Sequence, residues 1–178
     1  AENELESAAA RATLLEAGLI VDGSGGPSWT GDLLMIGDRI AALGEGLRRR
    51  LPAGVDDDTL DVVDCRAKVI APGFIDVHTH DDAIVLRDPL CLPKISQGIT
   101  TVVTGNCGIS LAPYRTPQAQ PPLTLLGIDS FRHATMAEYR AAVEAARPAL
   151  NVAALVGHTT LRFAAMEALD RAATDDER

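Results

Sequence analysis

The chain has 178 residues, of which 47% are hydrophobic and 23% are charged, so it can bury a globular core. Its net charge of −9 argues against nucleic acid or an anionic membrane surface as a partner, and no apolar run approaches the roughly 18 residues that a membrane-spanning helix needs. The start, AENELESAAARATLL, lacks the features of a signal peptide, and three cysteines without CxxC spacing indicate a reducing compartment, so we predict a cytoplasmic protein.

The first third of the chain has the pattern of short strands separated by turns. Residues 1–12 are acidic and rich in alanine, and we expect them to form a lead-in. From residue 13 onward, apolar segments are separated by the turn sequences GSGGPS and LPAGVDDD. This spacing predicts a small β layer over residues 13–68. Cys65 lies in this region and Cys91 beyond it, and we expect both to be structural because neither follows a predicted buried strand.

After about residue 70 the pattern becomes an alternation of strands and helices. Three largely non-alternating apolar runs predict buried strands, at residues 69–78, 99–105 and 151–157. Helices are predicted between and after these strands, at residues 87–97, 135–147 and 161–173. The alternation predicts parallel pairing, with the last two helices packed on one side of the sheet. The fold class is therefore α/β, with three β/α units over residues 69–178.

Each predicted buried strand is followed by a side chain that can bind metal or substrate. His78 and His80 close the first strand, Cys107 follows the second, and His158 follows the third. Ligands of α/β sheets and barrels bind at the carboxyl ends of the strands, so these residues should converge on one face. In an extended segment, residues i and i+2 project to the same side, so His-x-His suits a divalent metal such as zinc. The Cys107 thiolate is a further soft ligand.

A simpler interpretation exists for each of these residues. The histidine pair can be buried in the core with its ring nitrogens hydrogen-bonded, and Cys107 alone can be a small buried apolar residue. Asp81 and Asp82 can cap the following helix. The histidine pair and Cys107 occur together at the ends of neighbouring strands, and this combination favours a metal site. A structural hydrogen bond explains His158 about as well as a site does. We expect His158 to line the pocket as a substrate-binding residue, since nothing pairs with it at ligand spacing.

Three segments together resemble a known family: VIAPGFIDVHTHDD, GITTVVTGNCGIS and NVAALVGHTTLR. They are similar to the N-acyl-D-amino-acid deacylases of the amidohydrolase superfamily, and GNCG after GITTVV is more specific than His-x-His. The opening GLIVDGSGGPSWTGDLLMIGDRIAALGEGL resembles the first part of that family's small β-sandwich. The resemblance runs from about Thr13 to Arg171. It implies that residues 69–178 are the first three β/α units of a (β/α)₈ TIM-type barrel, preceded by part of a β-sandwich.

The resemblance also implies a reaction and a set of metal ligands. The reaction is zinc-dependent hydrolysis of an N-acyl-D-amino acid to a carboxylate and a free D-amino acid. By the resemblance, Cys107 is a metal ligand, and His78 and His80 form the other metal position. Gly105 and Gly108 would let the backbone around Cys107 approach the metal closely.

The chain departs from this family in its length. A (β/α)₈ barrel takes about 250 residues by itself, and the family draws further histidine ligands and a catalytic aspartate from later strands. No residue present can therefore be assigned as the general base. We expect a second polypeptide to carry the rest of the barrel, and the chain alone to be inactive. The alternatives are another amidohydrolase, similar to dihydroorotases or hydantoinases, and a catalytically silent structural or interaction subunit.

Overall fold

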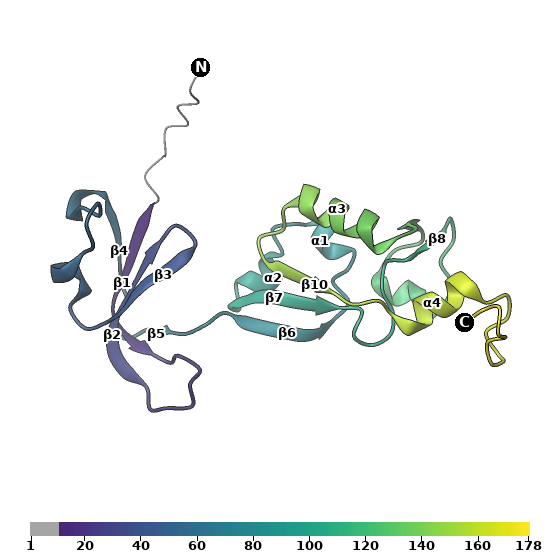
Figure 1. Ribbon diagram of the computed structural model, residues 1–178, viewed down its shortest axis with the longest axis horizontal. Coiled ribbons are helices and arrows are strands. Elements are labelled where there is room, and N and C mark those ends of the chain that lie inside the picture. Colours follow the sequence, from purple (N-terminus) through teal and green to yellow (C-terminus); the bar gives the residue numbers. More distant parts are fainter. Residues whose placement is uncertain (1–10) are drawn as a thin grey trace, which may run out of the picture. The chain divides into compact units, whose positions relative to one another are not determined.

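The computed structural model describes residues 11–178 and is shown in Figure 1. The chain divides into two compact units, one ending at Pro72 and the other comprising Gly73–Arg178. The lead-in predicted over residues 1–12 lies outside the described residues except for its last two, and Ala12 already belongs to a strand. Within the described part of the chain, no helix combines the length and the apolar character needed to cross a membrane.

The first unit contains one five-stranded sheet. Its strands are β1 (Ala12–Ile20), β2 (Trp29–Ile36), β3 (Arg39–Gly44), β4 (Leu60–Asp64) and β5 (Val69–Ile70). The order is β3-β2-β1-β4, with β5 also pairing with β1; β1 is antiparallel to β2 and parallel to β4 and β5. Two 3₁₀ turns, at Leu47–Arg50 and Asp57–Thr59, connect β3 to β4. The small β layer predicted for this region is present.

A buried carboxylate, Asp32 of β2, joins an irregular point of β1 to the turn that follows β3. Its side-chain oxygens accept hydrogen bonds from the backbone N–H groups of Ala17 (2.8 Å) and Leu47 (2.9 Å). Ala17 has a left-handed backbone (φ 59°) and lies where the pairing of β1 with β2 shifts register. Asp32 therefore provides the acceptor for two backbone N–H groups, one in β1 and one at the start of a 3₁₀ turn.

The strand predicted over residues 69–78 is wrong in its extent, because the chain forms two strands there. β5 ends at Ile70 and pairs with β1, whereas β6 (Phe74–Thr79) belongs to the second unit. Pro72 lies between them and has no N–H to donate to a ladder, which interrupts the pairing. β6 is also not buried, since Phe74 and Val77 are 64% and 60% exposed. The apolar run that suggested burial lies on an edge strand, as the pairing below shows.

The second unit contains a three-stranded parallel sheet, which confirms the predicted pairing. Its order is β10-β7-β6, with β7 at Ile99–Thr104 and β10 at Asn151–Ala154. The helices of this unit are α1 (Ile84–Arg87), α2 (Leu92–Ile95), α3 (Met136–Ala146) and α4 (His158–Ala165). A hairpin of β8 (Tyr114–Thr116) and β9 (Phe131–His133) and a 3₁₀ turn at Leu123–Leu126 complete it.

Helix α3 matches its prediction, and local sequence explains both of its ends. The Thr135 hydroxyl accepts a hydrogen bond from the Glu138 N–H (3.1 Å), which caps the first turn. At the other end Arg147 adopts a left-handed backbone (φ 52°), directly before Pro148. Val143 of α3 packs against the core cluster that contains Val102 of β7, so the helix covers the sheet.

The other two helix predictions need correction. The single helix expected at residues 87–97 is two short helices, α1 and α2, separated by a turn that contains Pro89. The helix expected at residues 161–173 instead occupies His158–Ala165. It lies beyond the carboxyl ends of the strands and contacts β8, rather than packing beside α3 (Figure 1). Helix α4 packs against strand β8 of the β8–β9 hairpin. This hairpin was not predicted from the sequence, because its short strands have no periodic pattern of apolar residues.

Candidate metal centre

The structure brings together His78, His80 and Cys107, as the sequence predicted. Their potential ligand atoms all lie within 4.8 Å of one another. Within residues 11–178, these three form the one group of at least three His, Cys, Asp or Glu side chains close enough to share a metal ion. The Cys107 Sγ lies 3.6 Å from His80 Nε2, and the two imidazole ring centroids are 6.1 Å apart. The site contains two nitrogen donors and one sulfur donor, which is a set that zinc prefers.

Two strands and one tight turn position these donors. His78 lies in β6 and His80 follows it, while Cys107 lies in the turn after β7. The Asn106 side-chain amide donates to the Val77 carbonyl (2.8 Å) and so fastens this turn to β6. The predicted convergence of the strand ends is therefore reinforced by a side chain next to Cys107.

Gly105 makes the turn before Cys107 possible. Its backbone is left-handed (φ 79°), and a Cβ at this position would lie 2.2 Å from the Leu155 carbonyl oxygen, just after β10. The Leu155 N–H in turn donates to the Thr104 carbonyl (3.0 Å). Only glycine permits both the backbone conformation and this close approach.

The three donors fit a metal ion that also contacts solvent or substrate. His78 and Cys107 are exposed and His80 is partly buried, so a ligand can reach all three. Structural zinc sites are closed by four protein ligands, whereas catalytic sites keep a position open for water or substrate. The described residues therefore fit a zinc ion with open coordination positions. The assignment of these side chains as ligands remains a prediction.

Asp81 and Asp82 do not cap the following helix, so that interpretation is wrong. The N-cap of α1 is Ala83, without a side-chain hydrogen bond. Asp82 is 1% exposed, and its Oδ1 accepts from the Leu111 N–H (3.1 Å) while its carbonyl accepts from the Tyr139 hydroxyl (2.9 Å). Burial raises the pKa of Asp82 to about 6. Asp82 is thus a buried link between the β6 end, the loop after β7 and α3.

Lys94 of α2, to which the sequence assigned no role, binds Asp81 close to this centre. The lysine Nζ lies 2.9 Å from the Asp81 Oδ2 and 2.6 Å from the Asp76 Oδ2. Asp76, two residues before His78, was equally missed. The sequence provides only weak evidence for these ion pairs: two carboxylates flank His-x-His, and a lysine lies in a helix that follows them. Whether the lysine reaches the carboxylates depends on where α2 packs.

His158 does not join the histidine–cysteine group. It is the first residue of α4, is exposed, and lines a hollow with residues of α4 and the following segment, including Arg162, Met166 and Glu177. The backbone near it does contact the turn after Cys107, because the Thr159 N–H donates to the Gly108 carbonyl (2.8 Å). The substrate-binding role of His158 stays a prediction.

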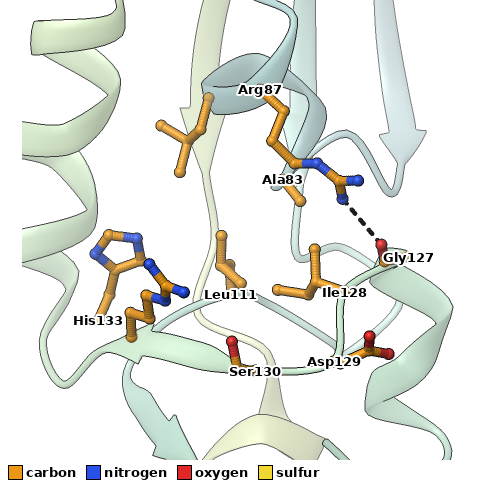
Figure 2. A pocket seen from close by; sticks show the side chains of 10 residues that line it. Ala83, Arg87, Leu111, Gly127, Ile128, Asp129, Ser130 and His133 are labelled. Atoms are coloured by element: carbon orange, nitrogen blue, oxygen red, sulfur yellow. Dashed lines mark hydrogen bonds between the residues drawn. The ribbon is translucent and has the colours of Figure 1, made fainter. Parts of the chain in front are cut away.

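A separate pocket of about 570 Å³ lies between α1, the loop before β9, and β9 itself (Figure 2). Its lining includes Arg87, whose Nη1 donates to the Gly127 carbonyl (2.9 Å), and His133. Burial is the main cause of the lowered pKa of His133, which keeps this ring neutral. None of the three candidate metal ligands lines this pocket, so the pocket and the candidate metal centre are different sites.

Comparison with known proteins identifies similar sequences over nearly the whole chain. Residues 61–178 match the model of the Amidohydrolase family. The chain is 51% identical over 176 residues to an N-acyl-D-aspartate deacylase of Alcaligenes xylosoxydans xylosoxydans, covering 98% of this chain and 34% of that protein. It is 49% identical over 166 residues to a D-aminoacylase of the same organism, covering 92% of this chain and 32% of that protein.

Solved structures agree with these sequence relatives. A crystal structure of a D-aminoacylase superposes with a TM-score of 0.85 at 46% identity, over 93% of this chain and 33% of that one. An N-acyl-D-glutamate deacylase of Bordetella bronchiseptica, complexed with zinc and a phosphonate inhibitor, gives a TM-score of 0.81 at 44% identity, with the same coverage. The chain thus spans about a third of the length of the relatives that it matches.

Proposed function

This chain belongs to the amidohydrolase family, and we propose that it forms part of an enzyme that hydrolyses N-acyl-D-amino acids. The products would be a carboxylate and a free D-amino acid, and the metal would be zinc. The observation that carries this proposal is the convergence of His78, His80 and Cys107 within 4.8 Å. It occurs in a chain about half identical to deacylases of this substrate class, one of which binds zinc.

The chemistry divides between the metal and the chain. Bound zinc would polarise the amide carbonyl and lower the pKa of a coordinated water towards neutrality. The chain itself holds the donors in place, through the Gly105 turn and the bond from Asn106 to β6. Within residues 11–178 we place no general base, and we propose that this group comes from further polypeptide.

We propose that this further polypeptide completes a (β/α)₈ barrel around the parallel sheet. The relatives are about three times as long as this chain, and three parallel strands cannot close a barrel. Both outer strands of the described sheet have an unpaired edge, and Phe74, Ile75 and Val77 of β6 are more than half exposed. An added segment would cover these side chains and supply the remaining ligands. We also propose that His158 contacts the substrate and that the enzyme works in the cytoplasm.

The proposal is tested by assaying release of free D-amino acids from N-acetyl-D-amino acids with added zinc. The 178-residue chain is assayed alone and then with the segment that the deacylase relatives carry in addition. We expect turnover only in the combined sample. Turnover by the chain alone would contradict the need for a second segment, and a combined sample inactive on every N-acyl-D-amino acid would contradict the substrate class.

The metal is tested by measuring the zinc stoichiometry of the Cys107→Ala variant. We expect a loss of tightly bound zinc with little change in unfolding free energy, because the Cys107 side chain is exposed and packs into no core cluster. Cys65→Ala serves as the control, since that thiol is buried in a core cluster of the first unit. Unchanged zinc content in the Cys107 variant would exclude it as a ligand. Copper is included as a competing metal, because a D-aminoacylase variant has been crystallised with it.

A second candidate is a cyclic amidohydrolase, because the chain is also 34% identical to a dihydroorotase over 111 residues. That match covers 62% of this chain, against 98% for the N-acyl-D-aspartate deacylase, so linear substrates are favoured. Dihydroorotate and hydantoins therefore belong in the substrate panel. Activity on these cyclic amides without activity on linear ones would reverse the preference. A combined sample that is folded but inactive on both would favour the silent subunit.

A further inference from the structure

A compact ion cluster lies beside the candidate metal centre, around the ammonium group of Lys94. This group lies 2.6 Å from the Asp76 Oδ2, 2.9 Å from the Asp81 Oδ2 and 3.1 Å from the Thr79 hydroxyl. The Thr79 hydroxyl also donates to the Asp81 Oδ2 (2.7 Å). All four side chains thus form one hydrogen-bonded unit, which we call the Lys94 cluster.

The Lys94 cluster holds the chain on both sides of each histidine. Asp76 precedes His78, Thr79 separates the two histidines, and Asp81 follows His80. The second oxygen of Asp76 also accepts a hydrogen bond from the His78 backbone N–H (3.3 Å). Three of the six residues from 76 to 81 are therefore bound to one ammonium group, and the other three are Val77 and the two histidines.

This anchoring coincides with a break in the strand. Asp76 and Thr79 are three residues apart and would face opposite sides of a regular strand, yet both contact the same lysine. The pairing of β6 with β7 shifts register between these two residues. The Lys94 cluster thus stabilises an irregular strand end, where backbone pairing alone does not fix the direction of the histidine rings.

The cluster is shielded enough to act as an anchor. The side chains of Lys94, Asp76 and Asp81 are 24%, 27% and 16% exposed. Burial by itself lowers the pKa of Lys94, but its bonds to Asp76 and Asp81 outweigh burial and raise the pKa. The same bond lowers the pKa of Asp76. Lys94 and Asp76 are therefore charged near neutral pH, and losing the lysine would leave the Asp76 and Asp81 side chains next to each other without the ammonium group that binds both.

We propose that Lys94 is a positioning residue of the metal centre: by binding Asp76 and Asp81 it orients His78 and His80 for metal binding. The inference rests on the metal site of the proposed function and adds to it a residue outside the ligand set. Residues that orient metal ligands typically contribute tenfold to a hundredfold to metal affinity. Lys94 would change metal affinity by a similar factor without contacting the metal or the substrate.

A purely electrostatic role for Lys94 predicts the opposite sign. Lys94 carries a positive charge close to a site for a divalent cation, and it neutralises two carboxylates there. If charge alone mattered, removing the lysine would strengthen zinc binding. If Lys94 orients the histidines, removing it weakens zinc binding. The direction of the change therefore separates the two roles.

The test uses Lys94→Met, which keeps the length of the side chain and removes its charge. Lys94→Arg is the conservative variant, since a guanidinium can donate to both carboxylates. Lys68→Met is the matched control, because Lys68 is the other lysine of the chain and lies in the first unit. Zinc affinity of the 178-residue chain is measured by competition with a chelating dye. We expect Lys94→Met to weaken binding about tenfold to a hundredfold, with Lys94→Arg and Lys68→Met close to wild type.

A second measurement reads the orientation of the rings without metal. The chain has four histidines, so their imidazole NMR signals can be assigned, with His133 and His158 as internal references. We expect the His78 and His80 signals of metal-free Lys94→Met to broaden or split, while the references stay unchanged. Unchanged or tighter zinc binding by Lys94→Met would overturn the proposal. If the wild-type chain by itself binds no zinc, unchanged His78 and His80 signals in Lys94→Met would overturn it. Neither readout uses turnover, so a wrong substrate class would leave this test intact.

Discussion

Gly105 offers the sharpest test of how the turn that carries Cys107 is built. Gly105 has a left-handed backbone (φ 79°), and a Cβ there would lie 2.2 Å from the Leu155 carbonyl oxygen. Gly127 provides a matched control in the same unit, because it is also left-handed (φ 66°) but has nothing within 4 Å of an added Cβ. Changing each glycine to alanine therefore separates the backbone penalty from the steric one.

The expected magnitudes follow from these two environments. Both variants carry the penalty of about 1–2 kcal/mol for an L-residue in the left-handed region. Gly105→Ala in addition forces the end of β10 away, for which overpacking typically costs about 1–3 kcal/mol. That shift also strains the bond from the Leu155 N–H to the Thr104 carbonyl, which contributes about 0.5–1.5 kcal/mol. We expect Gly105→Ala to be less stable than Gly127→Ala by about 2–4 kcal/mol.

The assay is urea-induced unfolding followed by signals that separate the two units. The two tyrosines, Tyr114 and Tyr139, lie in the second unit, whereas the single tryptophan, Trp29, lies in the first. Near-ultraviolet circular dichroism of tyrosine gives the unfolding free energy of the unit that contains Gly105, and Trp29 fluorescence monitors the other. Equal destabilisation by the two alanine variants would refute the close approach of Gly105 to β10.

Three further predictions concern buried or partly buried polar groups. Tyr139→Phe should lower the unfolding free energy by about 1–2 kcal/mol, because the Asp82 carbonyl loses a buried donor; an unchanged urea midpoint would contradict this. Asp32→Ala should destabilise the first unit by about 2–4 kcal/mol, because two backbone N–H groups lose their acceptor. Trp29 fluorescence measures this change, and Asp38→Ala is the control because Asp38 is exposed. The neutral form of His133 is favoured in the fold, so its stabilisation is present above about pH 6.5 and is lost as pH falls through the lowered pKa. His133→Gln should therefore make the unfolding free energy less sensitive to acid, and an equal loss on acidification in both proteins would exclude this role.

Much of the candidate metal centre could be predicted because its signals are local in the sequence. His-x-His follows an apolar run, and Cys107 stands between glycines after a β-branched run, so each marks the end of its own strand. Parallel pairing then brings these ends together, as the structure shows. The helix over residues 135–147 was equally predictable, since Thr135 and Pro148 mark its ends. His158 was harder to place, because its direction depends on where α4 packs.

The sequence by itself determined the alternation of strands and helices after about residue 70, the parallel sheet and the three side chains that meet at its carboxyl edge. These features depend on short-range patterns of polarity, glycine and proline, which act within a few residues. Only the tertiary structure decided that Val69 and Ile70 pair with β1, that α4 lies against the β8–β9 hairpin, and that Lys94 binds the carboxylates around His-x-His. Each of these depends on contacts between segments distant in sequence. The residues next to a lysine or a short apolar run do not indicate which distant segment it will contact.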